Sequence, residues 1–351
     1  MARQRLKELD IMRGLAIIII IFHHLPYVSL NYYDLRNFGI NLDLSFLNDL
    51  NAYFGLGLFI YISGVLLQGN YHDLSNCRQV RSFAKKRFFR IFPLYYIALA
   101  IFMKMLAVTD TRLILTHALG LQLVLASYYY RPLLTLWYIG LITIYYGLFV
   151  LIKRAEGNNL QLFITLLGFP LLLIILGVKE SVGDIRLLQY YPVFLLGLFG
   201  DKIFPHIRQD YKKTAGLAIL FFSSVCLYAL YIYQSRMVLL STGGLGAFLL
   251  TSCITISFAW LVRLLSLKGA GVSKYFKILS YSSYCIYLFH RPIWWALLKM
   301  DYPADPMMRL AYLGLIGIPV TILISYAIQK TYDRVSALIF SFLPRVPRIP
   351  A

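Results

Sequence analysis

The sequence predicts an all-α polytopic membrane protein, a single domain over residues 1–351 that forms a bundle of about ten transmembrane helices. Of its 351 residues, 60% are hydrophobic, and the mean hydropathy is +0.69. Apolar stretches of about 20 residues, the length that crosses a bilayer as a helix, recur along the chain. The net charge of +19 lies mainly between these stretches. Cytoplasmic loops carry such an excess of Lys and Arg, so the lipid bilayer is the expected partner and no nucleic acid is inferred.

The expected spans are the apolar segments 11–28, 52–68, 91–108, 133–152, 161–177, 187–200, 215–233, 246–265, 277–298 and 309–328. A further apolar stretch, 113–126, is shorter, and we expect an external or re-entrant excursion there. All the basic segments can be cytoplasmic only if two crossings separate Arg90 from Lys153. Both termini are then cytoplasmic, in a plasma (inner) membrane. A count of eleven spans would place Lys153, or the C-terminus, outside.

The first span carries ionisable residues, which are costly inside a membrane and are read by default as functional. Arg13 and His24 are eleven positions apart, about three helical turns, so they face nearly the same side about 16 Å apart along the axis. The His24 imidazole can accept a proton near neutral pH, or it can simply hydrogen bond to a neighbouring helix. His23 points about 100° away and has less weight.

Three arginines lie at expected membrane boundaries. Asp10 and Arg13 are three positions apart and can pair, so Arg13 either anchors the first helix or binds an anionic cosubstrate. Arg87 and Arg90 are also three apart, where the third span begins, and arginine pairs grip phosphates through forked hydrogen bonds. Membrane topology alone explains such basic residues too, although least well for Arg90.

Two motifs lie inside other spans. The small pair Ser63 and Gly64 allows close helix packing. The segment 280–292 contains Tyr287 and His290, and His290 is either a second polar group of a site or a hydrogen bonder at a helix end. The four cysteines are scattered, so neither a metal site nor a disulfide framework is predicted. No serine has a G-x-S-x-G context, which argues against a serine hydrolase.

Five ordered blocks resemble the acyltransferase-3 family of integral membrane acyltransferases. They are L-D-x-x-R-G-L-A from Leu9, with ten residues between Arg13 and His24; the block Phe59–Gly64; R-x-x-R at Arg87 and Arg90, followed by Pro93, Leu94 and Tyr95; Leu136-Trp137-Tyr138; and S-Y-x-x-Y-x-I-Y-L-x-H ending at His290. The blocks cover nearly the whole chain. Many family members have a glutamate five or six residues after the tryptophan, where this chain has Ile142 and Thr143.

The resemblance implies transfer of an acyl group, commonly acetyl, from cytoplasmic acyl-CoA to a hydroxyl of an envelope carbohydrate or lipid-linked glycan. It implies that His24 is the essential histidine, with Arg13 its motif partner and Asp10 beside it. Arg87 and Arg90 are implied as the other essential pair. With Ser63 and Trp137, they are the expected acyl-CoA residues.

Two mechanisms remain open: His24 activates the acceptor hydroxyl directly, or it carries the acyl group in a covalent intermediate. Tyr287, His290 and His23 are secondary candidates for the acceptor side. A proton-coupled transporter or flippase of a lipid-linked sugar is the alternative function, because charged residues within spans also suit proton coupling. A third reading, a structural membrane scaffold, predicts that Arg13, His24 and Arg90 tolerate substitution.

Overall fold

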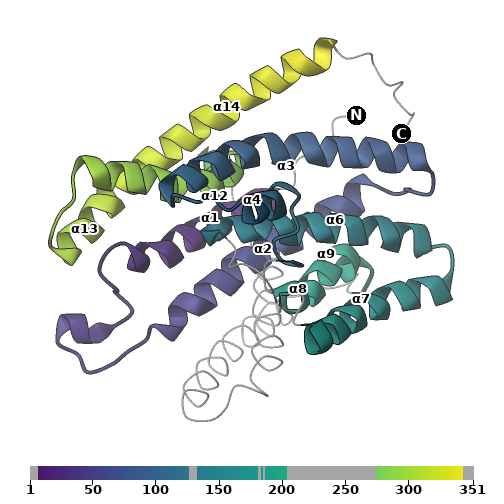
Figure 1. Cartoon of the computed structure of the whole chain (residues 1–351), viewed down its shortest axis with the longest axis horizontal. Coiled ribbons are helices and arrows are strands. Elements are labelled where there is room, and N and C mark those ends of the chain that lie inside the picture. Colours follow the sequence, from purple (N-terminus) through teal and green to yellow (C-terminus); the bar gives the residue numbers. More distant parts are fainter. Residues whose placement is uncertain (1–6, 126–132, 181–182, 185, 204–273, 343–351) are drawn as a thin grey trace.

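The computed structural model describes residues 7–125, 133–180, 183–184, 186–203 and 274–342 (Figure 1). Within these ranges the regular structure is helical, apart from one isolated bridge between Asp34 and Asp43. The helices are α1 (Lys7–His24), α2 (Phe46–Asn70), α3 (Cys77–Met105), α4 (Thr111–Ala118), α6 (Trp137–Ala155), α7 (Asn159–Glu180), α8 (Arg186–Gln189), α9 (Tyr191–Ile203), α12 (Lys274–Met300), α13 (Pro306–Tyr312) and α14 (Ile318–Phe342). A π-helical turn, Leu313–Gly317, joins α13 to α14.

The helical fold class and the membrane location are confirmed, whereas the count of ten spans stays a prediction. Five helical stretches in the described residues are long and apolar enough to cross a bilayer: Glu8–Tyr27, Leu50–Asn70, Cys77–Met105, Leu134–Ala155 and Pro306–Leu338. A shorter apolar helix covers Asn159–Ile175. Helix α12 has 27 residues, enough to span, but it is richer in polar side chains. The expected spans 215–233 and 246–265 lie outside the described residues.

The basic segment before the third span is helical, where the sequence analysis expected a loop over 69–90. Helix α3 begins at Cys77 because a capping box satisfies its first backbone N–H groups: the Asn76 side chain accepts from Gln79 N at 2.8 Å, and the Gln79 side chain accepts from Asn76 N at 3.2 Å. The helix continues through Pro93 into the apolar half. Arg87 and Arg90 therefore lie on one continuous helix, which fixes their positions relative to each other.

Two other boundaries differ from the prediction, and one short stretch agrees with it. Helix α2 begins at Phe46, within the connection that the sequence analysis assigned to a loop. The expected span 187–200 is divided between α8 and α9, with the break at Tyr190. The stretch 113–126 overlaps the short helix α4, which has eight residues and is too short to span, as predicted.

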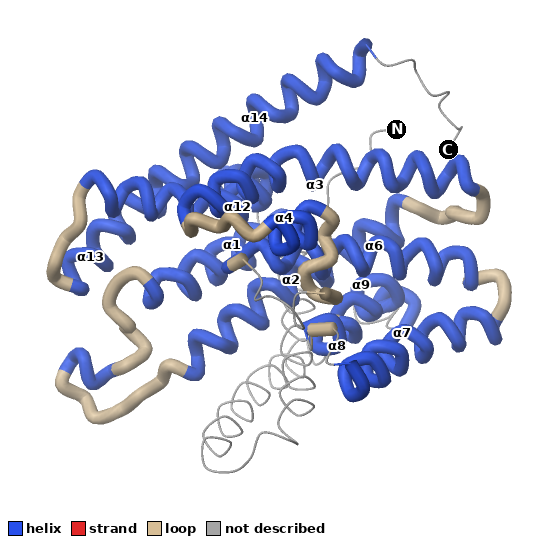
Figure 2. Tube along the Cα trace, in the orientation of Figure 1, coloured by secondary structure: helices blue, strands red, loops and turns tan. Residues whose placement is uncertain are grey.

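Helices distant in sequence form the centre of the bundle. Helix α1 packs against both α2 and α12, α2 packs against α9, and α12 packs against α14 and α3 (Figure 2). At the other end of α1, the backbone N–H of Leu30 donates to the Pro306 carbonyl at 3.2 Å. The loop after α1 and the start of α13 therefore lie at the same end of the molecule.

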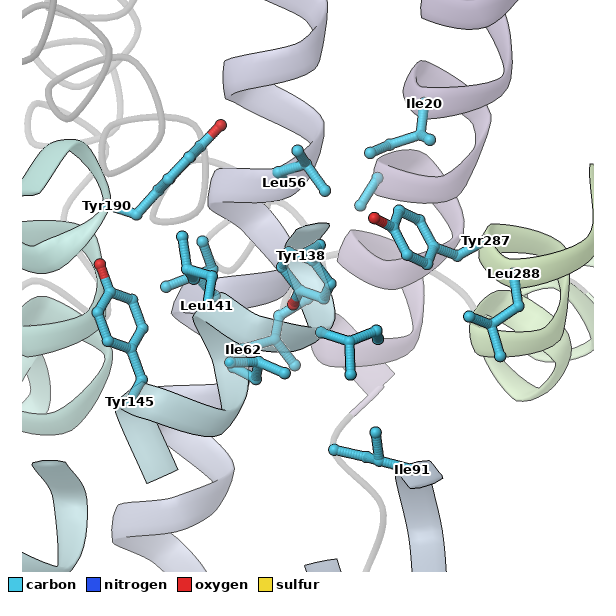
Figure 3. Packing of buried hydrophobic residues seen from close by; sticks show 14 of the residues in the cluster. Ile20, Leu56, Ile62, Ile91, Tyr138, Leu141, Tyr145, Tyr190, Tyr287 and Leu288 are labelled. Carbon is cyan, nitrogen blue, oxygen red and sulfur yellow. The ribbon is translucent and has the colours of Figure 1, made fainter. Parts of the chain in front are cut away.

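The packing of α2 on α9 confirms the close approach predicted at Ser63-Gly64. A methyl group on Gly64 would lie 2.8 Å from the Phe194 carbonyl oxygen and 2.9 Å from the Gly197 Cα. A methyl group on Gly197 would collide with the Tyr61 carbonyl oxygen. Because these obstacles are backbone atoms, two glycines are needed where the helices cross. Around this crossing, Ile62, Leu141 and Tyr145 belong to the buried core (Figure 3).

Candidate active site

A cavity of about 550 Å³ lies among six helices: α1, α2, α3, α6, α12 and α14. Its lining includes three cations, Arg13, Lys86 and Arg90, and a single carboxylate, Asp333. Lys86 and Arg90 are exposed on α3, while Arg13 is half-buried on α1. The excess of positive charge makes this cavity suited to an anionic ligand.

The carboxylate of Asp333 is held by neutral donors. The Tyr281 hydroxyl donates to Oδ2 at 2.6 Å, and Gln329 Nε2 donates to Oδ1 at 2.9 Å. In the part of the chain that the structure describes, no Lys or Arg forms an ion pair with this carboxylate. Asp333 therefore leaves Lys86 and Arg90 available to a ligand.

Two tyrosines of the cavity lining contact each other. Tyr138 and Tyr287 both line it, and their rings meet edge to face with centroids 5.3 Å apart. Tyr287 points from α12 toward Tyr138 (Figure 3), and its hydroxyl donates to the Thr135 carbonyl. Ser63 also lines the cavity. These contacts connect α12 with α6 and with the turn that precedes α6.

Asp10 connects α1 to α12 beside the cavity. Its side chain is buried, and Oδ1 accepts a hydrogen bond of 2.7 Å from Ser280 Oγ. Ser280 lines the cavity with Arg13, which lies one turn after Asp10. A buried carboxylate is costly without partners, so this bond holds the two helices in register where Arg13 enters the cavity.

Arg87 and Arg90 have different environments, although the sequence analysis expected both to bind acyl-CoA. Arg90 lines the cavity. The Arg87 guanidinium packs among three aromatic rings, with its Cζ 5.2 Å from the Tyr71 centroid, 5.6 Å from that of Phe83 and 5.3 Å from that of Tyr146. Tyr146 lines the cavity, and Arg87 packs against its ring. Arg87 therefore positions a residue of the cavity lining and does not line the cavity itself.

The cavity contains a cation that the sequence analysis did not select. Lys86 lines the cavity with Arg90, four residues later. Residues four apart on a helix lie on the same face, so this spacing was the available signal.

Replacing Arg87 tests its packing role. We expect Arg87→Lys to lower thermal stability in detergent, because each cation–π contact contributes about 0.5–2 kcal/mol and a compact ammonium cannot contact three rings as a planar guanidinium does. Melting curves measured beside Arg81→Lys, an exposed position on the same helix, provide the matched comparison. Equal melting temperatures for the two variants would contradict this role.

His24 and His290 lie outside the lining of the cavity. His24 is the last residue of α1, and its ring stacks on that of His290 with centroids 5.0 Å apart and planes inclined by 4°. Arg291 Nη2 donates to His24 Nδ1 at 3.4 Å. His290 is fully buried, and its Nδ1 lies 3.0 Å from the carbonyl oxygens of both Ile286 and Tyr287.

His23 has a separate environment. It is buried, and its Nδ1 lies 2.8 Å from the Asn48 carbonyl oxygen and 3.1 Å from Asn48 Oδ1. His23 therefore links α1 to α2, whereas His24 faces α12.

Helix α12 connects the cavity with the histidine pair. Ser280, Ser283, Tyr284 and Tyr287 line the cavity at helical spacing, and His290 follows one turn later on the same helix. His24 itself is not a lining residue of this cavity. Arg13 and His24 are separated by about 16 Å along α1. Arg13 therefore lies at the cavity, and His24 lies at the end of the helix away from it.

Trp137 lies outside the cavity. The Arg186 guanidinium covers its ring at 4.1 Å, and the ring of Tyr190 stacks against it with centroids 6.4 Å apart. Among the residues described by the structure, no group of three or more His, Cys, Asp or Glu side chains is arranged to hold a metal ion.

A family model described as an acyltransferase domain, acyltransferase 3, matches residues 6–330. The match covers nearly the whole chain, includes both members of the histidine pair and ends within α14. No curated protein sequence and no solved structure matches the chain.

Proposed function

Because the chain belongs to the acyltransferase-3 family of membrane acyltransferases, we propose that it transfers an acyl group from acyl-CoA to a carbohydrate hydroxyl. Acetyl is the proposed acyl group, and the proposed acceptor is an envelope polysaccharide or a lipid-linked glycan. The observation that carries this proposal is the cation-lined cavity, which α12 connects to the pair His24 and His290.

The donor site is the cavity. Lys86 and Arg90, with Arg13 further in, supply charge-assisted hydrogen bonds to the phosphates of acyl-CoA. The pantetheine arm and thioester enter the apolar end past Phe59 and Ile142. Ile142 is one of the two positions where many family members carry glutamate, so this mechanism uses no carboxylate there.

In the proposed reaction His24 is the general base. Its imidazole takes the proton of the acceptor hydroxyl as the oxygen attacks the thioester carbonyl. The carbon–sulfur bond then breaks, and the imidazolium returns the proton to the CoA thiolate. Tyr138 and Tyr287 line the cavity, and Tyr287 lies one turn before His290 on α12, so the thioester arm passes these rings to reach His24.

The alternative chemistry places the acyl group on His24 before it reaches the acceptor. Mixing the purified protein with radiolabelled acetyl-CoA, without acceptor, separates the two routes. Label that remains on wild type and is absent from His24→Asn supports the covalent route. Label that appears only on acceptor supports direct transfer.

Release of CoA thiol from acetyl-CoA tests the proposed function. Detergent-purified full-length protein is assayed with and without an envelope glycolipid extract, and we expect release that depends on the extract. Absence of release from folded protein with every extract and acyl-CoA tried would overturn the proposal. Movement of a labelled sugar lipid across liposomes without acyl-CoA would instead support a transporter.

Arg90→Gln tests the donor site within the same assay. We expect the KM for acetyl-CoA to rise by about 10-fold or more, because a charge-assisted hydrogen bond contributes about 1.5–3 kcal/mol. The KM for acceptor is expected to change little. Arg81→Gln, which removes an exposed arginine from the same helix outside the cavity, is the control. Equal effects of the two substitutions on the donor KM would contradict the assignment.

A further inference from the structure

Arg291 is a half-buried cation without an acidic partner among the described residues. Its guanidinium contacts His24 Nδ1 at 3.4 Å and lies 5.9 Å from the ring centroid of Tyr27. No carboxylate of the described residues lies within ion-pair distance of it. Partial burial of an unpaired charge is costly, so such a cation is a candidate to receive an anion.

The acids of the loop after α1 are engaged elsewhere. Arg36 Nε donates to Asp34 at 2.7 Å, and Arg36 Nη2 reaches Asp43 at 3.4 Å. The hydrogen bonds from Arg36 hold the pKa of Asp34 below its usual value, so this pair stays ionised near neutral pH. The loop is close to the histidines, because the Tyr32 hydroxyl donates to the Phe22 carbonyl. Its carboxylates nevertheless leave Arg291 uncompensated.

The contact with Arg291 determines which nitrogen of His24 carries the proton. A guanidinium only donates, so Nδ1 of His24 accepts, and a neutral ring then carries its hydrogen on Nε2. This arrangement occupies the lone pair that a general base needs. The neighbouring histidines have other partners: His23 Nδ1 contacts Asn48, and His290 Nδ1 donates to backbone carbonyl oxygens, so its lone pair lies on Nε2.

The surroundings indicate what kind of anion can reach Arg291. His24 ends α1, and beside it Phe22 and Tyr27 are exposed apolar side chains, at 45% and 58% of their full area. Aromatic side chains exposed at the end of a transmembrane helix are typical of the membrane–water boundary. A phosphate that joins a glycan to a lipid lies at this same depth.

We propose that Arg291 binds the phosphate of a lipid-linked acceptor, and that this contact withdraws Arg291 from His24 and frees Nδ1 to accept the hydroxyl proton. The proposal rests on the proposed acyl transfer. Arg291 forms forked hydrogen bonds to two phosphate oxygens. His24 then takes the proton at Nδ1, the acyl carbon–oxygen bond forms, the carbon–sulfur bond breaks, and the proton passes to the CoA thiolate. Binding of the acceptor thus frees the His24 nitrogen that deprotonates the acceptor hydroxyl.

Turnover kinetics test the proposal. Thiol release is measured with the phosphate-bearing fraction of an envelope glycolipid extract, and with the same fraction after mild acid has removed the phosphate. In wild type we expect the acceptor KM to be at least about 10-fold lower with phosphate, given the strength of a charge-assisted pair. Arg291→Gln is expected to lose this preference, with the acetyl-CoA KM within about 3-fold of wild type, and Arg291→Lys to retain part of it.

Arg309→Gln is the matched control. Arg309 belongs to α13 at the same end of the molecule, where its guanidinium already bonds to Tyr302 and to the carbonyls of Pro303 and Ala304. This variant is expected to keep the preference for phosphate. An unchanged preference in Arg291→Gln, or equal use of both fractions by wild type, overturns the proposal.

A binding measurement separates failure of this proposal from failure of the proposed function. Full-length protein with ¹⁵N-labelled histidine, in a non-ionic detergent, is titrated with methyl phosphate, and His24→Asn identifies the His24 signals. We expect the His24 Nδ1 resonance to move in wild type and to stay fixed in Arg291→Gln, even if no extract supports turnover. A resonance that never moves overturns the phosphate site. Full movement in nanodiscs of phosphatidylglycerol alone shows that ordinary headgroups fill the site, which overturns the acceptor assignment.

Discussion

Replacing His24 with asparagine is expected to reduce the rate of acyl transfer by about 10²–10⁴-fold, the usual contribution of general-base catalysis. Asparagine can still accept a hydrogen bond from Arg291 through its side-chain oxygen, but it cannot take a proton from the acceptor. We therefore expect the loss in kcat, with the KM for acetyl-CoA little changed, because the cavity cations lie about three turns away on α1 and on α3. Initial rates of thiol release at saturating donor measure the effect.

The control for this prediction is His72→Asn, an exposed histidine after α2. Since the His24 ring packs on that of His290, both variants are first compared with wild type by gel filtration and thermal melting. A folded His24→Asn protein that retains wild-type kcat would exclude His24 as the base. A loss accompanied by a large fall in melting temperature is resolved by testing His24→Gln, which fills more of the space.

Gly197→Ala is expected to cause the largest loss of stability among the substitutions considered. An added methyl group would collide with the Tyr61 carbonyl oxygen on α2, and backbone atoms inside a helix cannot move aside as a side-chain end can. Overpacking of this kind typically costs about 1–3 kcal/mol, and separation of the two helices would cost more. Because Ser63 on α2 lines the cavity, we also expect reduced activity. The measurement is the fraction of protein that remains monodisperse after heating in detergent.

Gly147→Ala provides the matched comparison. Gly147 also lies within a helix, α6, but an added methyl group there meets nothing within 4 Å. Alanine favours a helix over glycine by about 1 kcal/mol, so this variant should be as stable as wild type or more stable. Equal melting of both variants would show that the α2–α9 crossing tolerates a wider separation.

Several features of the site were predictable because they depend on local spacing. Asp10, Arg13 and His24 occupy one helix, and residues about three turns apart must lie on the same side. The structure accordingly places Arg13 in the cavity and His24 against His290, both toward α12. The same geometry predicts that His23 points to a different side of α1 from His24, and the structure places His23 against Asn48 on α2.

Other assignments depended on neighbours that the sequence does not reveal. Arg87 and Arg90 have similar local contexts, yet Tyr71 and Tyr146 come from other parts of the fold to surround Arg87. Lys86 lines the cavity because α3 and α14 both border it. Trp137 packs under the Arg186 guanidinium and does not line the cavity. That Arg291 has no acidic partner among the described residues depends on where the acids near α1 lie in the fold.

The sequence by itself determined the helical membrane class, the spacing of Arg13 and His24, and the need for a close contact at Gly64, because hydropathy, helical period and residue size are local properties. Tertiary structure alone decided which side chains share the cavity, that His24 stacks on His290, and that Arg291 donates to His24. These contacts join positions up to 270 residues apart, as in the hydrogen bond between Asp10 and Ser280. Helix packing brings such partners together, and no local pattern encodes their distance or orientation.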